Sequence, residues 1–393
     1  MIYYTNRSRK KQEIYGFSLQ SQHFHLSLAS PKILSFGKTK QKTSFCLVFR
    51  SLIRIFANKS NSRMNVSNKP NNQDQTPLVS FIITYYNLPV DMLHECIESI
   101  MQLSLQPEER EIILIDDGSD ITPLNEIIDY RDEIIYLRQH NQGLSIARNV
   151  GVNISRGKYI QFVDADDCLI TGGYEHCLDV IRKKEPDMVI FNFTHEGTNV
   201  DTPYLFEGPV SGTEFMHHNN LRASACGYIF TRKTLGELRF TPQLLHEDEE
   251  FTPLLILRAD TIYSTDTYAY YYRIRENSIV HNDDTKWQEK RLDDAEYVIM
   301  QLDHLANTLA SSERIALQRR VAQLTMDYIY NIIMLTHSEQ QLEERLTRLQ
   351  KCGMFPLPDR DYTQKYKWFR KMTNSKTGRK ILMRTLPLLW KEK

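Results

Sequence analysis

Short apolar runs alternate with polar, helix-forming stretches between residues 77 and 193. The apolar runs cover residues 79–84, 112–115, 134–137, 159–163 and 188–193. Helices are predicted between them over residues 91–104, 144–154 and 172–184. Because strands that alternate with helices form βαβ units, this part of the chain is predicted to be a Rossmann-like α/β domain, a mainly parallel sheet flanked by helices.

Polar residues follow three of these strands at the point where each strand ends. They are Thr84-Tyr85-Tyr86-Asn87, Asp116-Asp117-Gly118-Ser119 and Asp164-Ala165-Asp166-Asp167. In parallel sheets, ligands bind beyond the carboxyl ends of the strands, so these groups predict a binding site at that edge. Taken alone, residues 116–119 are equally well explained as a plain turn, since Asp and Gly favour turns.

The chemistry of this edge excludes several kinds of site. A Gly-x-Gly-x-x-Gly turn after the first strand and a Gly-Lys-Ser/Thr loop are both missing, which argues against a dinucleotide crevice and a phosphate-binding loop. A calcium loop starting at Asp164 fails because Cys168 and Leu169 stand where an oxygen ligand and a glycine are required. Carboxylates repel a bare phosphate, so a divalent cation shared with a nucleoside diphosphate is the predicted ligand.

The carboxyl-terminal third predicts mainly helices, with apolar stripes at Leu317, Val321 and Leu324 and at Leu342, Leu346 and Leu349. Residues 365–393 contain ten Lys or Arg and one acidic residue, interleaved with aromatic and aliphatic side chains. Two interpretations stay open for this tail: contact with an anionic membrane surface, and a packed helix with a solvated basic face. Without an accompanying nucleic-acid-binding motif, no nucleic-acid partner is expected.

The net charge of zero, from 49 basic and 49 acidic residues, is a sum of unlike parts. Residues 1–63 carry +11, residues 64–364 carry −20, and residues 365–393 carry +9. The basic N-terminal extension is either a membrane-surface arm or, as we expect, disordered or untranslated sequence upstream of a start at Met64. Six cysteines without a Cys-x-x-Cys pair favour a reducing, cytoplasmic location. The predicted parts are residues 1–76, 77–280, 281–364 and 365–393.

Residues 79–280 resemble glycosyltransferase family 2, whose members have the GT-A fold. The resemblance rests on the three strand-end motifs given above and on Gly143-Leu144-Ser145-Ile146-Ala147-Arg148-Asn149, Glu247-Asp248-Glu249 and Tyr272-Arg273-Ile274-Arg275. The order and spacing of these motifs, more than any one of them, make the resemblance specific. It implies a GT-A domain followed by a helical C-terminal region.

The resemblance also implies roles for individual residues. Thr84, Tyr86 and Asp117 are implied to line the nucleobase pocket, and Arg148 to lie beside the nucleotide. Asp164 and Asp166 form the Asp-x-Asp pair that reaches ribose and the divalent metal, with Asp167 as a further metal ligand. Asp248 is implied to be the general base. Arg273 and Arg275 either contact the diphosphate or form surface ion pairs, and the sequence leaves both open.

The expected function is therefore transfer of a sugar from a nucleotide-diphosphate donor, expected to be a UDP-sugar, with Mg²⁺ or Mn²⁺. A single carboxylate base predicts in-line attack and inversion at the anomeric carbon. The expected acceptor is a cell-surface glycan, as in lipopolysaccharide or capsule, or a lipid-linked unit at the inner face of the cell membrane. Two alternatives stay open: a catalytically silent module that binds nucleotide sugars or glycans, and a nucleotidyltransferase.

Overall fold

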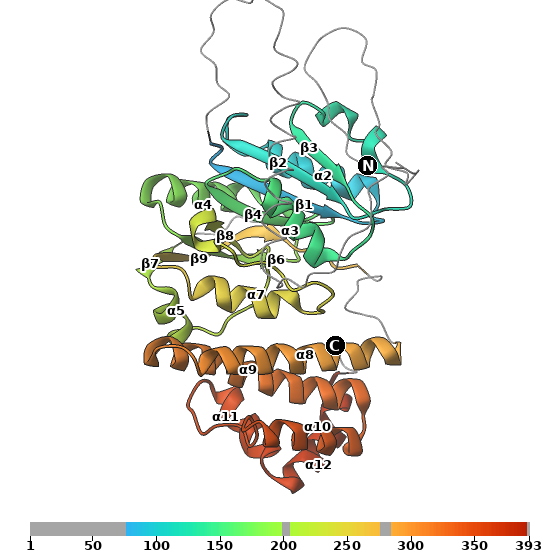
Figure 1. Ribbon diagram of the computed structural model, residues 1–393, viewed down its shortest axis with the longest axis vertical. Coiled ribbons are helices and arrows are strands. Elements are labelled where there is room, and N and C mark those ends of the chain that lie inside the picture. The colour runs from blue at the N-terminus through green and yellow to red at the C-terminus, as the bar shows by residue number, and fades with distance from the viewer. Residues whose placement is uncertain (1–75, 199–204, 276–283, 391–393) are drawn as a thin grey trace, which may run out of the picture. The chain divides into compact units, whose positions relative to one another are not determined.

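The computed structural model in Figure 1 describes residues 76–198, 205–275 and 284–390. The predicted N-terminal extension lies outside the described residues, except for Thr76 at its end. Its proposed start at Met64 and its two interpretations therefore stay predictions.

A single mixed sheet forms the centre of the structure, in the strand order β3-β2-β1-β4-β8-β6-β9-β5, with β7 paired to β9. The strands are β1 (Val79–Tyr85), β2 (Arg110–Asp116), β3 (Ile134–Arg138), β4 (Tyr159–Asp164), β5 (Cys168–Leu169), β6 (Met188–Thr194), β7 (Phe206–Val210), β8 (Tyr228–Thr231) and β9 (Ile262–Tyr271). Strands β1 to β4 pair in parallel, as β6 and β9 do. The predicted α/β class, a mainly parallel sheet flanked by helices, is confirmed.

Helices cover the sheet where the apolar spacing predicted them. The first helices are α2 (Val90–Met101), α3 (Leu144–Ile154) and α4 (Thr171–Lys184). In α2, Leu93, Cys96, Ile97 and Ile100 are buried, which is the stripe expected for a helix with one face on a core. Helix α3 packs on β1 and β2, and α4 packs on β6 and β9. These contacts enclose the apolar strands on which the site is built.

The register of the sheet aligns the ends of three strands. Thr84 of β1 pairs with Asp164 of β4 on one side and with Ile115 of β2 on the other. Tyr85 pairs with Asp116, which in turn pairs with Arg138 of β3. The polar residues that follow these strands therefore lie along one edge, as predicted from the sequence.

Strand β8 divides the sheet, because it runs antiparallel to both β4 and β6. It has only four residues, and all are buried. Such a short run has no distinctive period, which explains why the sequence did not predict it. Strand β6 nevertheless points in the same direction as β4, so the carboxyl ends of β6 and β9 reach the same edge as those of β1 and β4.

The C-terminal part is helical, as predicted. Besides the short α5 (Gly212–His218) and α6 (Arg232–Leu235), the later helices are α7 (Glu247–Ile256), α8 (Thr285–Ala306), α9 (Ser311–Thr336), α10 (Glu339–Lys351), α11 (Gln364–Thr373) and α12 (Lys376–Trp390). Helices α8 and α9 pack along each other, and α9 also packs on α5. The predicted stripes are core positions, since Leu317, Val321, Leu324, Leu342, Leu346 and Leu349 are all buried.

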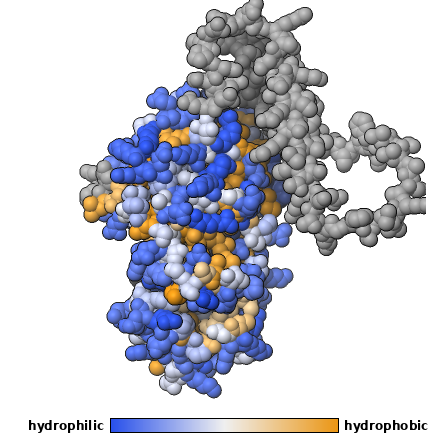
Figure 2. Space-filling view, turned by 60° about the vertical axis from the view of Figure 1, so that its left-hand side comes forward, coloured by the Kyte–Doolittle hydropathy of each residue, from blue (hydrophilic) through white to orange (hydrophobic). Residues whose placement is uncertain are grey.

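Among the described residues, no helix combines the length and apolarity needed to cross a membrane. The face in Figure 2 is mostly hydrophilic, and its hydrophobic residues gather in separate patches. Three exposed large hydrophobic residues of the described chain belong to the last helices: Trp368 in α11, and Ile381 and Leu388 in α12.

Candidate active site

Three aspartates stand at the carboxyl end of β4, as the strand-end motif predicted. Asp164 is the last residue of the strand, and Asp166 and Asp167 follow in the turn before β5. Burial together with the nearby Asp164 charge raises the pKa of Asp166, while Arg275 opposes this effect. Burial and Asp164 also raise the pKa of Asp167. The turn therefore concentrates negative charge in a place where it is poorly solvated.

Asp167 differs from the other two because both of its oxygens accept hydrogen bonds from the protein. The Tyr270 hydroxyl donates to one oxygen at 2.9 Å, and the Arg273 backbone N–H donates to the other at 2.8 Å. Its side chain is buried. This geometry ties the β4 end to the end of β9. The implied role of Asp167 as a metal ligand stays a prediction, and Asp164 and Asp166 are the better placed carboxylates.

Arg148 connects the β4 aspartates to the start of helix α7. Its guanidinium donates to Asp164 at 2.9 Å and to Glu247 at 2.7 Å. The Phe162 and Phe240 rings also lie near it, with centroids 5.8 and 5.4 Å from the guanidinium carbon. Asp164 and Glu247 raise the pKa of Arg148 against the effect of burial, so the side chain stays charged. Whether it also contacts the nucleotide, as the resemblance implies, stays a prediction.

Asp248, the implied general base, is the second residue of α7 and is half-buried. Burial and the adjacent Glu247 charge raise the pKa of Asp248 to about 7, although Arg148 and Arg320 lower it. General bases work best when their pKa is close to the operating pH. The environment of Asp248 therefore suits a proton acceptor near neutral pH.

The turn before α7 is held by helix α8. His246 has a left-handed backbone with φ of 62°, which is uncommon for a residue other than glycine. Its ring accepts a hydrogen bond from Arg291 Nε at 3.1 Å, and burial and this arginine lower the pKa of His246 to about 4. The Leu245 N–H donates to Asp294 at 2.8 Å. Asp248 thus follows a turn whose shape depends on residues of α8.

Helix α9 fixes the same segment from another side. Arg320 pairs with Glu249, the residue after Asp248, and its other terminal nitrogen donates to the Leu221 carbonyl at 2.8 Å. The Arg320 side chain is buried. Its position explains why the C-terminal helices matter for the site as well as for packing.

The residues implied to bind the nucleobase lie at the ends of β1 and β2. Thr84 is buried, whereas Tyr86 is 47% exposed. Asp117 is also buried, and its two oxygens accept bonds from the Gln139 side chain at 2.6 Å and from the Gln142 and Gly143 N–H groups at 2.9 and 2.8 Å. Asp117 therefore holds the loop before α3 in place. The nucleobase role of these three residues stays a prediction.

The two arginines after β9 both contact the β4 turn. Arg275 forms an ion pair with Asp166 at 2.6 Å. Arg273 donates from Nε to the Asp166 carbonyl at 2.8 Å and pairs with Glu95 of α2. The sequence left open whether these arginines form ion pairs or contact the diphosphate. The ion pairs are present. Contact with a diphosphate stays a prediction.

The residues of the β4 turn fit a divalent cation that shares its shell with a ligand. Asp164 and Asp166 each use one carboxylate oxygen in the arginine contacts, which leaves the other oxygen of each for a ligand. In the described part of the chain, no group of three or more His, Cys, Asp or Glu side chains is arranged to hold a metal ion. Mg²⁺ is commonly held by one or two carboxylates together with substrate phosphates, which matches this donor set.

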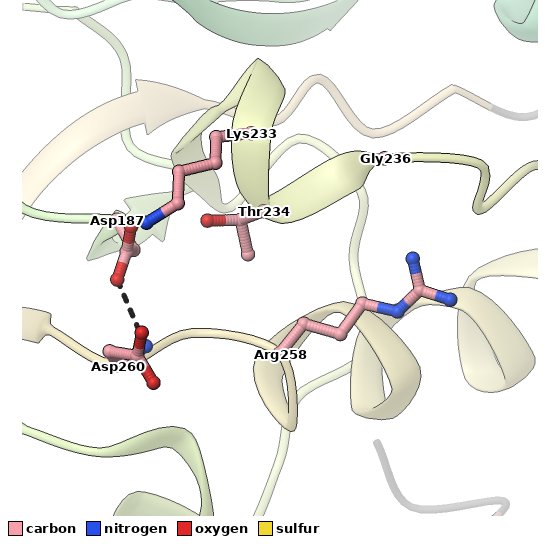
Figure 3. Close-up of a pocket in the computed structure, with 6 residues that line it drawn as sticks. All are labelled: Asp187, Lys233, Thr234, Gly236, Arg258 and Asp260. Atoms are coloured by element: carbon pink, nitrogen blue, oxygen red, sulfur yellow. Dashed lines mark hydrogen bonds between the residues drawn. The ribbon is translucent and has the colours of Figure 1, made fainter.

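A pocket of about 330 Å³ lies elsewhere, near the amino-terminal ends of β6 and β9. Figure 3 shows Asp187 at its wall, accepting a hydrogen bond from the Asp260 N–H at 2.9 Å. The Thr261 N–H also donates to Asp187, at 3.0 Å. Asp187 thus holds the residues before β9 in place. This pocket is separate from the sheet edge that carries the β4 aspartates.

Several residues of the site carry no signal in the sequence. They are Tyr270, His246, Arg291, Asp294 and Arg320, whose partners lie between 45 and 103 positions away along the chain. Local periodicity cannot reveal such pairs. The only hint of this part of the site in the sequence was the run of acidic residues at the start of α7. An ordinary solvated helix N-terminus has the same composition.

Comparison with known proteins identifies the family. Residues 80–233 match the family model of glycosyl transferase family 2. An uncharacterized glycosyltransferase of Haemophilus influenzae is 30% identical over 182 residues, which cover 44% of this chain and 70% of the relative. The minor teichoic acid biosynthesis protein GgaB of Bacillus subtilis is 29% identical over 212 residues, or 50% of this chain and 23% of the relative.

A third relative is the poly(ribitol-phosphate) beta-N-acetylglucosaminyltransferase TarP of Staphylococcus aureus. It is 25% identical over 207 residues, which cover 50% of this chain and 63% of TarP. The chain thus spans less than a quarter of GgaB and somewhat under two thirds of TarP.

Among solved structures, residues 1–349 of S. aureus TarS, crystallised with UDP-GlcNAc, superpose with a TM-score of 0.57 at 18% identity. The match covers 80% of this chain and 91% of the TarS chain, and shows the same fold. With the matching family model, the Haemophilus influenzae relative and the fold shared with TarS, this chain belongs to glycosyl transferase family 2 and has the GT-A fold.

Proposed function

We propose that this protein transfers a sugar from a nucleoside-diphosphate donor to a hydroxyl group of a cell-surface glycan or a lipid-linked acceptor. Family membership supports glycosyl transfer, and the names of GgaB and TarP connect relatives to teichoic acid and poly(ribitol phosphate). A UDP-sugar is the donor to test first, because the TarS structure holds UDP-GlcNAc.

One observation carries the proposal. Asp248, whose carboxyl group has a raised pKa, is connected through Arg148 to Asp164 at the β4 turn, where the donor would bind. Asp248 follows Glu247, Glu247 binds Arg148, and Arg148 binds Asp164. A donor at the β4 turn and a base at the start of α7 would therefore keep a defined separation. Positioning of this kind is a major source of rate enhancement in group transfer.

In the proposed reaction, Asp248 accepts the proton of the acceptor hydroxyl while its oxygen attacks the anomeric carbon. The bond between that carbon and the donor phosphate breaks, and the nucleoside diphosphate leaves with the electron pair. Attack opposite the leaving group inverts the configuration, so an α-linked donor would give a β-linked product. The proton on Asp248 is then lost to water.

The leaving diphosphate needs positive charge beside it. Asp164 and Asp166 are the residues that would hold Mg²⁺ or Mn²⁺, which would act as a Lewis acid on the diphosphate. Arg273 and Arg275 lie at the same turn and would add positive charge. Both arginines would have to exchange part of their present carboxylate contacts for phosphate oxygens.

The basic tail supports a peripheral contact with an anionic membrane, which would bring the enzyme to a lipid-linked acceptor. Trp368 is 53% exposed on α11 beside the exposed Lys371. On α12, Ile381, Arg384 and Leu388 are exposed at spacings of three and four residues, which places them on one face. Basic residues mixed with large apolar ones are typical of interfacial helices.

The direct test uses the purified full chain with a panel of nucleotide sugars, with and without Mn²⁺. We expect one UDP-sugar to raise the unfolding temperature more with Mn²⁺ than without it, and to be hydrolysed slowly without an acceptor. Asp248→Asn should bind this donor but not turn it over, while Glu250→Gln in the same helical turn should stay active. Binding without any turnover by the wild type would indicate a silent module, and release of pyrophosphate a nucleotidyltransferase.

A further inference from the structure

A cluster of three rings and one arginine lies at the carboxyl ends of β6 and β9. Phe193 is the second-last residue of β6, His195 follows that strand, and Tyr272 follows β9. The ring centroids are 5.8 Å apart for Phe193 and His195, 5.9 Å for Phe193 and Tyr272, and 5.4 Å for His195 and Tyr272. The guanidinium carbon of Arg222 lies 4.0 Å from the Phe193 centroid.

The backbone holds this cluster together. The Tyr272 N–H donates to the Thr194 carbonyl at 2.9 Å, which joins the ends of the two strands. His195 Nδ1 lies 2.9 Å from the Tyr272 carbonyl oxygen. The rings are therefore fixed by the sheet, although His195 and Arg222 are exposed to solvent.

The cluster adjoins the expected donor end of the site. Tyr272 precedes Arg273, whose N–H binds Asp167. The charges of Asp167, Asp164 and Asp166 add to the effect of burial in raising the pKa of Tyr272, so the Tyr272 hydroxyl is within electrostatic reach of all three. A molecule lying on the Tyr272 ring would be next to the bound donor.

The cluster is also connected to the expected base. Arg222 follows Leu221, whose carbonyl accepts a hydrogen bond from Arg320 at 2.8 Å. The same Arg320 pairs with Glu249, the neighbour of Asp248. An acceptor has to reach both the donor and the base, and this cluster is joined to both.

Arg222 differs from the other arginines of the site in its partners. Arg148, Arg273, Arg275 and Arg320 each form an ion pair with a carboxylate. Within residues 76–198, 205–275 and 284–390, Arg222 has an aromatic contact and no ion pair. Stacking on a ring orients a guanidinium while leaving its N–H donors available, and such donors bind phosphate or carboxylate oxygens in pairs.

We propose that Phe193, His195, Arg222 and Tyr272 form an acceptor subsite for an anionic glycan or polyol chain, whose phosphodiester or carboxylate group binds Arg222. The exposed ring surfaces of His195 and Tyr272 would pack against the adjacent sugar or polyol. This inference rests on the proposed transferase function and adds the charge class of the acceptor. It differs from a donor role, because it requires Arg222 to act on acceptor binding alone.

The test measures binding to the full chain by calorimetry, using a glycerol phosphate oligomer, an oligouronate and a neutral oligosaccharide of similar length. We expect the wild type to prefer one of the two anionic probes over the neutral one. Arg222→Gln should weaken binding of that probe about tenfold or more, because a charge-assisted pair of hydrogen bonds is lost. Arg222→Lys should weaken its binding less. UDP binding and the neutral probe should not change.

Arg360→Gln, which removes another exposed loop arginine, is the matched control and should bind all probes as the wild type does. The phosphate and uronate probes separate the two sources of negative charge. A loss of UDP affinity in Arg222→Gln would overturn the subsite and assign the residue to the donor. Equal losses for charged and neutral probes, or no loss, would also overturn it.

This binding test, combined with the turnover assay of the nucleotide sugars described above, separates the two proposals. If the wild type turns over a nucleotide sugar but prefers neither anionic probe, the subsite is wrong and the transferase function stands. If an anionic probe binds through Arg222 but no nucleotide sugar is turned over, the subsite stands and the transferase function is wrong.

Discussion

The guanidinium of Arg148 lies 2.7 Å from a carboxylate oxygen of Glu247, a residue 99 positions further along the chain. This contact joins α3 to the first residue of α7. The other terminal nitrogen of Arg148 joins α3 to Asp164 at the end of β4. The Arg148 side chain is only 4% exposed. One buried cation therefore links the turn after β4 to the helix that carries Asp248.

Removing the Arg148 charge should destabilise the protein as well as stop the reaction. Arg148→Met would leave Asp164 and Glu247 without their cation, and breaking a buried pair in this way costs about 3–5 kcal/mol. Thermal and urea unfolding should show the loss. Lys183→Gln, which breaks an exposed ion pair with Asp179, should change stability by about 1 kcal/mol or less.

Arg148→Lys distinguishes charge from geometry, because lysine keeps the charge but cannot bind two carboxylates with one planar group. We expect it to recover most of the stability and little of the turnover. Full activity in Arg148→Lys would contradict the idea that the arginine sets the position of α7.

Asp166 and Asp248 should fail in different ways when replaced. Asp166→Ala should lose the effect of Mn²⁺ on UDP affinity, because the carboxylate expected to reach the cation is gone. Asp248→Ala should bind UDP and Mn²⁺ as the wild type does, with no detectable transfer. Calorimetric titrations of UDP with Mn²⁺ or with a chelator measure the difference.

Wild-type turnover by purified Asp248→Ala would remove Asp248 as the base. Unchanged Mn²⁺ dependence in Asp166→Ala would move the metal site to other residues. Asp179→Ala, a replacement on the exposed part of α4, provides the matched control for removing a carboxylate.

The rate should depend on pH through Asp248. The base acts only when deprotonated, so kcat/KM should rise as pH increases through about 7, where burial and Glu247 place its pKa. Arg148 and Arg320 are the cations that lower this pKa, so Arg320→Gln should move the acidic limb of the profile to higher pH. Arg320→Lys should move it less, because the charge is kept.

A pH–rate profile over pH 5 to 9 measures the limb, with thermal unfolding at each pH to exclude loss of fold. A purely structural role of Arg320 would lower the rate at all pH values without moving the limb. That outcome would contradict the electrostatic effect of Arg320 on Asp248.

The tail should bind anionic vesicles through its exposed basic and apolar residues. Each basic residue near such a surface contributes about 1 kcal/mol, so Lys371→Glu with Arg384→Glu should lower partitioning into phosphatidylglycerol vesicles by at least tenfold. Sedimentation with these vesicles and with phosphatidylcholine vesicles measures it. Lys183→Glu with Lys184→Glu on α4 controls for the change in net charge.

Binding that persists in the tail variant would contradict a membrane contact of α11 and α12. In that case the second interpretation, a packed helix pair with a solvated basic face, would hold. The burial of Tyr366, Phe369 and Leu382 shows that part of the pair does pack against the protein.

The sequence by itself determined the parts of this protein that depend on local spacing. Strands β1 to β4 and β6 and helices α2, α3 and α4 match their predicted ranges closely, because apolar residues at strand or helix spacing specify an element from within a few residues. The edge at which the polar groups gather was also predictable. Parallel strands end on the same side, so Thr84, Asp116 and Asp164 had to lie there once the strands were known.

Only the tertiary structure decided how these groups are connected. The antiparallel β8 between β4 and β6, the ties of Asp167 to Tyr270 and of Asp117 to the loop before α3, and the ion pairs of Arg148 and Arg320 bring together distant parts of the chain. Ion pairs and hydrogen bonds act over a few ångströms in space and leave no period along the sequence. The family resemblance could therefore name Asp248 as a candidate base, but the burial and neighbouring charges that set its pKa arise only when α3, α7 and α9 pack together.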